Sequence, residues 1–248
     1  MRYLILADIH ANLQALEAVL AEAATVGFDA TLCLGDLVGY GADPSAVISG
    51  IQALRPIVTV RGNHDKVCAG LARADDFNDA ARAAIEWTQS VLSPSELATL
   101  AALPEGPLPV EDGLEVCHGS PFDEDEYLLE VDAINLALRV TSGICLFGHT
   151  HVPALLTGAQ TGRGRPRGLV WSGFDGEPVL LPSGPCLVNV GAVGQPRDGD
   201  SRAAYGILDW DRRRLEARRV RYDVEGAQRR IIDAGLPRWL AERLALGQ

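Results

Sequence analysis

Histidine is the residue type that points most directly to chemistry in this chain. There are only five, and each stands at or just after the end of a short apolar run: His10, His64, His118, His149 and His151. Two aspartates, Asp8 and Asp36, and one amide, Asn63, stand in the same kind of position. Imidazole with carboxylate suits Zn, Fe, Mn or Ni, whereas pure oxygen sites suit Mg or Ca. The residue types therefore predict a site for transition-metal ions.

The size of this set indicates more than one ion. Eight candidate ligands are too many for one tetrahedral ion and suit two. A pair of ions roughly 3.5–4 Å apart is a recurring arrangement for phosphate-ester hydrolysis. Bound metal also lowers the pKa of its water, to ~7 on a well-placed zinc, which gives a nucleophile at neutral pH.

The apolar runs that precede these residues are typical of short buried strands. They are Tyr3–Ala7, Thr31–Leu34, Ile57–Val60, Leu114–Cys117 and Ile144–Phe147. Ligands collect at the carboxyl ends of strands in open α/β sheets, so we expect the polar residues to meet at one rim. In Asp8-x-His10 and His149-x-His151, period-2 spacing on extended backbone would send both side chains the same way. Glycines beside Asp36 and Asn63 would allow sharp turns and close backbone approach.

Helical patterns alternate with these strands, and further strands follow. The predicted helices are Asn12–Ala24, Pro44–Leu54, Phe77–Leu92, one to Leu103 opened by the capping box Ser93-Pro94-Ser95-Glu96, Val131–Arg139, Val224–Ala234 and Pro237–Leu246. Later strands are predicted at Leu169–Trp171, Val179–Leu181, Cys186–Val190, Ala204–Trp210 and Leu215–Val220. A βαβα start with antiparallel-looking strands later predicts an α/β sandwich, two packed sheets flanked by helices.

Composition excludes several classes of function. The 248 residues carry a net charge of −11, which argues against nucleic acid as the main partner. The only lysine, Lys66, is not in a Walker-A loop. No apolar run approaches the ~20 residues that a membrane span needs, so no membrane association is expected. Five cysteines without CxxC spacing indicate buried thiols in a cytoplasmic protein rather than a disulfide framework.

The ordered motifs resemble those of the calcineurin-like metallophosphoesterases. The resemblance spans nearly the whole chain and rests on Asp8-x-His10, Gly35-Asp36-x-x-Gly39, Gly62-Asn63-His64-Asp65, His118 and Gly148-His149-x-His151. It implies a single metallophosphoesterase domain over residues 1–248, folded as a four-layer α/β/β/α sandwich with two packed mixed sheets. It also implies a two-metal centre.

Residue by residue, the resemblance implies a role for each member of the motifs. The first metal would be held by Asp8, His10 and His151. The second would be held by Asn63, His118 and His149. Asp36 would bridge the two ions. His64 would face the scissile phosphate and protonate the leaving oxygen, with Asp65 orienting it; Asp65 capping the following helix is the alternative.

The sequence departs from the protein phosphatases of this family at two places. After Asp36 it reads Leu37-Val38-Gly39-Tyr40-Gly41, without the arginine that grips phosphate in those enzymes. Asp65 stands where they carry glutamate. The chain therefore looks closer to the small bacterial and archaeal phosphodiesterase-like branch. Arg197, in a turn-rich segment, is a candidate to replace the missing arginine as a substrate-binding residue. The acidic run Asp123–Glu126 is expected to be a solvated loop.

The leading hypothesis is a metal-dependent phosphoesterase acting on a small phosphate ester, with a phosphodiester favoured. A metal-bridging hydroxide would attack phosphorus and His64 would act as the general acid. The two divalent ions would be Mn, Fe, Ni or Zn. A phosphomonoesterase or dinucleoside-polyphosphate hydrolase on the same centre is the alternative, and a non-catalytic scaffold of the same fold is the third hypothesis. The sequence leaves the oligomeric state open, including a homo-oligomer.

Overall fold

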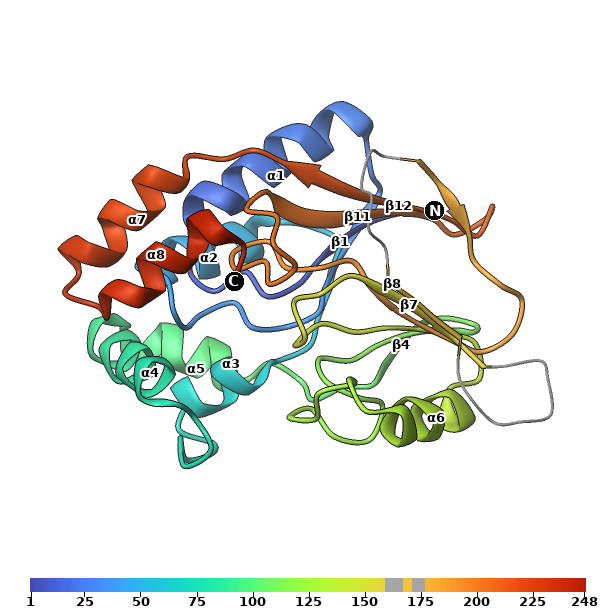
Figure 1. The fold of residues 1–248 in the computed structure, drawn as a ribbon, viewed down its shortest axis with the longest axis horizontal. Coiled ribbons are helices and arrows are strands. Elements are labelled where there is room, and N and C mark those ends of the chain that lie inside the picture. The colour runs from blue at the N-terminus through green and yellow to red at the C-terminus, as the bar shows by residue number, and fades with distance from the viewer. Residues whose placement is uncertain (159–166, 171–176) are drawn as a thin grey trace.

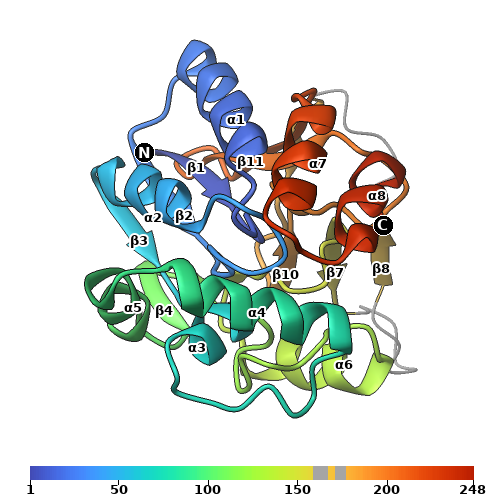
Figure 2. The same ribbon diagram turned by 90° about the vertical axis from the view of Figure 1, so that its left-hand side faces the viewer.

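Two six-stranded sheets pack face to face in the computed structural model, which describes residues 1–158, 167–170 and 177–248. Helices cover the outer surface of each sheet (Figures 1 and 2). This arrangement confirms the predicted sandwich of two mixed sheets flanked by helices. It also places the ends of strands from both sheets along one side of the molecule.

The first sheet has the strand order β3-β2-β1-β11-β12-β9. Its strands are β1 (Arg2–Leu6), β2 (Ala30–Cys33), β3 (Ile57–Thr59), β9 (Val179–Leu180), β11 (Ala203–Asp209) and β12 (Arg214–Val220). The first three run parallel, and β11 pairs antiparallel with β1. The parallel strands β1, β2 and β3 are the ones that the sequence predicted ahead of Asp8, Asp36 and Asn63.

The second sheet has the order β4-β5-β6-β10-β7-β8. Its strands are β4 (Leu108–Glu111), β5 (Leu114–Val116), β6 (Ile144–Leu146), β7 (Ala154–Thr157), β8 (Arg167–Val170) and β10 (Cys186–Asn189). Strands β5, β6 and β10 are parallel, and β7 is antiparallel to β10. The sequence patterns did not predict β4 and β7. Trp171, the predicted end of one strand, lies outside the described residues.

The helices follow the predicted patterns, with one addition. They are α1 (Leu13–Val26), α2 (Pro44–Ala53), α3 (Asn63–Cys68), α4 (Asp79–Val91), α5 (Pro94–Ala101), α6 (Val131–Val140), α7 (Val224–Asp233) and α8 (Arg238–Leu246). The capping box at Ser93 and Glu96 is confirmed. Helix α3, which begins at Asn63, was not predicted, because six residues are too short for a clear periodicity.

Strand β1 shows why the early apolar runs are continuous. Leu4 and Leu6 pack into the cluster that also holds residues of α1 and α2, such as Leu16. Tyr3 and Ile5 point the opposite way, into the cluster between the two sheets. A strand buried on both faces needs an apolar residue at every position, so the run has no polar alternation.

Three further features bear on the sequence expectations. Among the helices of the described residues, none combines the length and apolar character needed to cross a membrane. All five cysteines are buried, with free thiols. Helix α6 covers the outer face of the second sheet, where Ile134 and Leu138 pack against Phe147 and Leu187.

We expect Leu32→Ala to lower the free energy of unfolding by about 2–5 kcal/mol, because Leu32 is fully buried between the sheets. The matched control is Leu180→Ala in the same sheet, where the side chain is 74% exposed, and it should change stability by less than ~0.5 kcal/mol. Chemical denaturation followed by circular dichroism measures both. Equal effects of the two substitutions would contradict this description of the core.

Candidate metal centre

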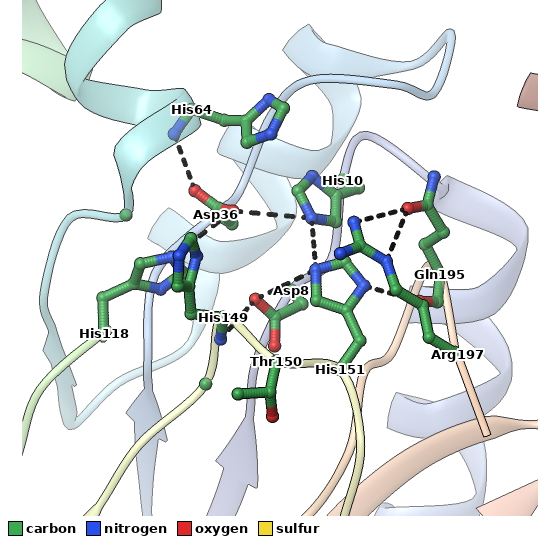
Figure 3. Close-up of polar contacts among 12 residues, drawn as sticks. Asp8, His10, Asp36, His64, His118, His149, Thr150, His151, Gln195 and Arg197 are labelled. Carbon is green, nitrogen blue, oxygen red and sulfur yellow. Dashed lines mark hydrogen bonds and ion pairs between the residues drawn. The ribbon is translucent and has the colours of Figure 1, made fainter. Parts of the chain in front are cut away.

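The polar residues that follow β1, β2, β5 and β6 meet in one buried cluster (Figure 3). Their ligand atoms form two groups, each with all atoms within 4.8 Å of one another. The first group is Asp8, His10, Asp36 and His151, and the second is Asp36, His118 and His149. Asp36 is common to both groups. The structure thus places this residue where the sequence predicted a bridging ligand.

Asn63 and His64 reach the same cluster from the start of α3. The Asn63 side-chain oxygen, Oδ1, lies 3.2 Å from Nε2 of His118. The backbone N–H of His64 donates to Oδ1 of Asp36 at 2.9 Å. The structure therefore brings together all seven residues predicted as metal ligands, with His64 next to them.

Backbone carbonyls fix the ring nitrogens of the first group. Nδ1 of His10 is 3.0 Å from the Val38 carbonyl oxygen, and Nδ1 of His151 is 2.6 Å from that of Gln195. A carbonyl oxygen only accepts hydrogen bonds, so both Nδ1 atoms must carry the proton. In the neutral rings, the two Nε2 atoms then present lone pairs, and they lie only 3.1 Å apart.

The second group is held in the same way. Nδ1 of His118 donates to the Leu34 carbonyl at 2.7 Å, and Nε2 of His149 donates to the Asp125 carbonyl at 3.1 Å. These bonds leave Nε2 of His118 and Nδ1 of His149 as the ring atoms available to a metal. Fixing one imidazole nitrogen on a carbonyl is the usual way in which proteins orient metal-binding histidines.

The donor set fits a bound metal ion. The facing lone pairs of His10 and His151 repel one another unless a cation or a proton lies between them. Oδ2 of Asp8 is buried and has no hydrogen-bond partner among the described residues. Two buried carboxylates with several imidazoles match the ligand preferences of Mn, Fe, Ni or Zn. Bound cations would satisfy the acceptors of this cluster at once.

Burial sets the protonation of these groups in the metal-free protein. It raises the pKa of Asp8 to about 7 and lowers the pKa of His10 and His151 well below the ordinary value. Both imidazoles are therefore neutral, the form that binds metals. Burial also lowers the pKa of His118, but the nearby Asp36 and Asp8 carboxylates outweigh this effect and raise its pKa to about 10.

The backbone at the site is bent, which corrects one expectation. Positive φ angles of 54°, 49°, 53°, 63° and 58° occur at Asp8, His10, Asp36, His149 and His151. Asp8 and His10 do converge, and so do His149 and His151, but the cause is not alternation on extended backbone. Each pair converges through left-handed residues, a strain of roughly 1–3 kcal/mol at each position that concentrates at functional sites.

Two glycines allow this close packing, and for Gly62, beside Asn63, this is what the sequence predicted. A Cβ atom at Gly62 would lie 2.1 Å from Oδ1 of Asp36, and one at Gly39 would lie 2.3 Å from Nδ1 of His64. Real Cβ contacts are never this short. Only glycine is compatible with these two positions.

His64 lies beside the first group and faces a pocket. Its ring centroid is 4.4 Å from that of Tyr40, 4.6 Å from that of Phe77 and 4.9 Å from that of His10. Asn63, Tyr40, Phe77 and His149 line the same pocket, which has a volume of about 170 Å³. Burial lowers the pKa of His64 to about 4. This placement is compatible with the predicted contact between His64 and a substrate.

The structure does not support the predicted orienting role of Asp65. Its Oδ1 accepts hydrogen bonds from the backbone N–H groups of Leu37 and Val38, and its Oδ2 accepts from Gly62. Nδ1 of His64 has no hydrogen-bond partner among the described residues. Asp65 therefore caps α3, the alternative role, and also holds the loop that follows Asp36.

Arg197 lies next to the first group (Figure 3). Its guanidinium donates to Oε1 of Gln195 at 2.9 Å and lies 5.8 Å from the centre of the Tyr40 ring. Its positive charge contributes to lowering the pKa of His10 and of His151. The structure thus brings the predicted substrate-binding arginine to the edge of the cluster.

The acidic run Asp123–Glu126 is solvated at Asp123 and Asp125, as expected, but it is anchored to the site at Glu124. Glu124 is only 5% exposed and forms ion pairs with Arg61 and Lys66 at 2.8 and 3.0 Å. This anchoring positions the Asp125 carbonyl against His149. No sequence pattern indicated this anchoring, because charge pairing between distant segments leaves no local pattern.

The sequence patterns also did not indicate the aromatic and amide residues around the cluster. The Tyr127 ring lies on His149 with 3.7 Å between centroids, and Gln195 contributes both its carbonyl, to His151, and its side chain, to Arg197. Tyr40 stands four residues after Asp36 in a glycine-rich segment, which is the one signal that could have indicated it.

Comparisons with known proteins decide the family. The sequence model of the calcineurin-like phosphoesterase superfamily domain matches residues 1–213. The chain belongs to this superfamily. The match confirms the resemblance that the ordered motifs indicated. Membership of this superfamily indicates a hydrolase, and the Asp and His groups of the cluster are suited to holding metal.

Individual proteins also match the chain over nearly its whole length. An uncharacterized protein of Methanocaldococcus jannaschii is 35% identical, over 98% of this chain and 97% of its own length. A metallophosphoesterase structure from Sphaerobacter thermophilus is 39% identical, with a TM-score of 0.87 and coverage of 100% and 99%. A hypothetical protein from Pyrococcus horikoshii shares the fold at 21% identity, with a TM-score of 0.77 and coverage of 100% and 98%.

We expect Asp65→Ala to lower the free energy of unfolding by at least ~2 kcal/mol, because three buried N–H groups lose their acceptor. The control is Asp223→Ala, which removes the exposed cap of α7 and should cost about 1 kcal/mol. Urea denaturation measures both. Wild-type stability of the Asp65 variant would show that these bonds do not hold the loop.

Proposed function

We propose that this protein is a dinuclear metal-dependent phosphoesterase that hydrolyses a small phosphate ester, with a phosphodiester as the favoured substrate. The observation that carries the proposal is the pair of buried ligand groups that share Asp36. One shared carboxylate between two sets of imidazoles suits two neighbouring divalent ions, an arrangement that recurs in phosphate-ester hydrolysis.

The ligand atoms divide between two sites. Asp8, His10 and His151 would hold one ion, while Asn63, His118 and His149 would hold the other, with Asp36 between them. Mn, Fe, Ni and Zn all suit these donors. When bound, such ions polarise phosphoryl oxygens and supply a strong nucleophile from water at neutral pH.

The pocket beside His64 is suited to the ester group that leaves. His64 lines it together with the aromatic rings of Tyr40 and Phe77, so a ring-containing alcohol fits beside these rings. Charged side chains such as Lys66 and Arg73 line other parts of the pocket. The negative charge of a bound phosphate favours a protonated imidazole. His64 would then hold the proton that the departing oxygen needs.

Arg197 is placed to hold the phosphate itself. Its guanidinium lies at the edge of the first ligand group and forms no ion pair with a carboxylate in the described part of the chain. A planar guanidinium can bind two phosphate oxygens at once. Arg197 would thus take the place of the arginine that is missing after Asp36.

The alternative enzymes differ in the ester that they hydrolyse and not in the metal centre that they use. A phosphomonoesterase or dinucleoside-polyphosphate hydrolase would use the same two ligand groups. A non-catalytic scaffold is disfavoured, because every predicted metal ligand is present and all of them converge. Activity on paired substrates separates these hypotheses.

Metal-stripped protein should regain hydrolysis of bis-p-nitrophenyl phosphate when Mn, Ni, Fe or Zn is added back. His64→Ala should lower kcat by about 10²–10⁴-fold, because a general acid is lost, while metal content stays the same. Asp36→Ala should lower both metal content and kcat, because it contributes to both ligand groups. Asp211→Ala is the matched control, with a side chain that is 75% exposed.

The outcomes are distinct. A preference for p-nitrophenyl phosphate would be consistent with the two-metal centre and would favour the phosphomonoesterase. Full activity of either His64→Ala or Asp36→Ala would contradict the assigned roles. Stoichiometric metal binding without turnover of either ester would favour the scaffold.

A further inference from the structure

Two arginines from distant parts of the chain converge on one tyrosine at the edge of the metal cluster. Arg197 follows β10, and Arg243 belongs to the C-terminal helix α8. Their guanidinium carbons lie 5.8 Å and 5.9 Å from the centre of the Tyr40 ring. Each is within the range of a cation–π contact. Nothing in the local sequence of α8 indicates that Arg243 belongs to a site.

Neither arginine is neutralised by an acidic side chain. Within residues 1–158, 167–170 and 177–248, neither forms an ion pair with an Asp or Glu side chain, although the chain holds 33 acidic residues. Arg197 donates to the side-chain oxygen of Gln195, which is uncharged. Arg243 donates only through Nε, to a backbone oxygen of Gln248, so its two terminal nitrogens have no hydrogen-bond acceptor among the described residues.

Both guanidinium groups are also partly withdrawn from water. Both side chains are partly buried, and burial together with the charge of Arg197 lowers the pKa of Arg243. Placing two like charges together in a partly buried position costs free energy unless an anion compensates them. Such an arrangement is typical of a site that awaits a negatively charged ligand.

The fold holds this pair in place. The backbone N–H of Gly199 donates to the carbonyl of Gly247 at 3.0 Å, which ties the segment after Arg197 to the end of α8. The contact is tight, because a Cβ atom at Gly247 would lie 2.6 Å from the backbone nitrogen of Asp200. The position of Arg243 relative to Arg197 is therefore built into the fold.

The same tyrosine links the arginines to the reaction site. The Tyr40 ring lies 4.4 Å from the His64 ring and 4.7 Å from the His10 ring, centroid to centroid. A ligand held by both guanidinium groups would thus lie directly beside a phosphate bound at the metals.

We propose that Arg197 and Arg243 form an anion subsite, which binds a second anionic group of the substrate, a phosphate or a carboxylate. This inference rests on the proposed phosphoesterase function and narrows its substrate class to esters with a second negative group near the scissile phosphate. Arg197, nearer the metal ligands, contacts both anions, whereas Arg243 contacts only the second. Forked contacts from arginine suit either anion.

The test uses the metal-loaded full chain and three product-like probes. Glycerol 3-phosphate carries one phosphate, 3-phosphoglycerate adds a carboxylate, and propane-1,3-diyl bisphosphate adds a second phosphate. Isothermal titration calorimetry measures their binding, and competition against bis-p-nitrophenyl phosphate gives inhibition constants. The variants are Arg243→Ala and, as the matched control, Arg238→Ala, which removes an 82% exposed positive charge from the same helix.

We expect wild-type protein to bind one or both doubly anionic probes more tightly than glycerol 3-phosphate. Arg243→Ala should weaken the binding of each preferred probe by about 10- to 100-fold, since a charge-assisted hydrogen bond is lost. It should change the binding of glycerol 3-phosphate by less than about twofold. Arg238→Ala should leave all three unchanged. The probe that loses most identifies the second anion as carboxylate or phosphate.

Equal binding of all three probes by wild-type protein would overturn the inference. The inference would also be overturned if Arg243→Ala weakened the binding of all three probes equally, or if the Arg243→Ala and Arg238→Ala variants bound the probes equally well. Thermal unfolding of each variant checks that the fold is intact, and Arg243→Lys tests whether charge alone is sufficient. Failure of the proposed function would give a different result: the protein would not hydrolyse the ester, but calorimetry would still show tighter binding of a doubly anionic probe.

Discussion

The central constraint in this structure is the convergence of buried electron-rich atoms at one point. The Nε2 atoms of His10 and His151 lie 3.1 Å apart, next to the buried carboxylates of Asp8 and Asp36. Without a cation these groups oppose one another, and with one they become ligands. Burying them is costly in the absence of compensation. The rest of the fold is organised so that this arrangement persists.

Backbone carbonyls are the main means of holding it. Val38, Leu34, Gln195 and Asp125 each present a carbonyl to one histidine, and they come from three separate loops. Each carbonyl fixes a tautomer, so that the other ring nitrogen faces the cluster. The left-handed residues after the strands and the glycines packed against Asp36 and His64 serve the same end. The site thus depends on both sheets being packed together.

Much of this organisation could be predicted from the sequence, because it is encoded locally. Apolar runs predicted β1, β2, β3, β5 and β6, and the polar residues after them predicted the members of the cluster. Tertiary contacts could not be predicted in this way. Asp65 bonds to Leu37, Val38 and Gly62 rather than orienting His64. Arg243 reaches Tyr40 because α8 packs into the same apolar cluster as Tyr40 and its end is tied to Gly199. Such contacts depend on how distant segments pack, which a pattern within one segment does not show.

Metal stoichiometry tests the central claim most directly. Purified protein would be stripped of metal, reloaded with Mn or Zn, dialysed and measured by inductively coupled plasma mass spectrometry. The two ligand groups that share Asp36 predict about two ions per chain, and removal of a ligand that belongs to one group only, by His149→Ala, predicts about one. A chain that retains no metal, or a variant that retains as much as the wild-type protein, would contradict this account.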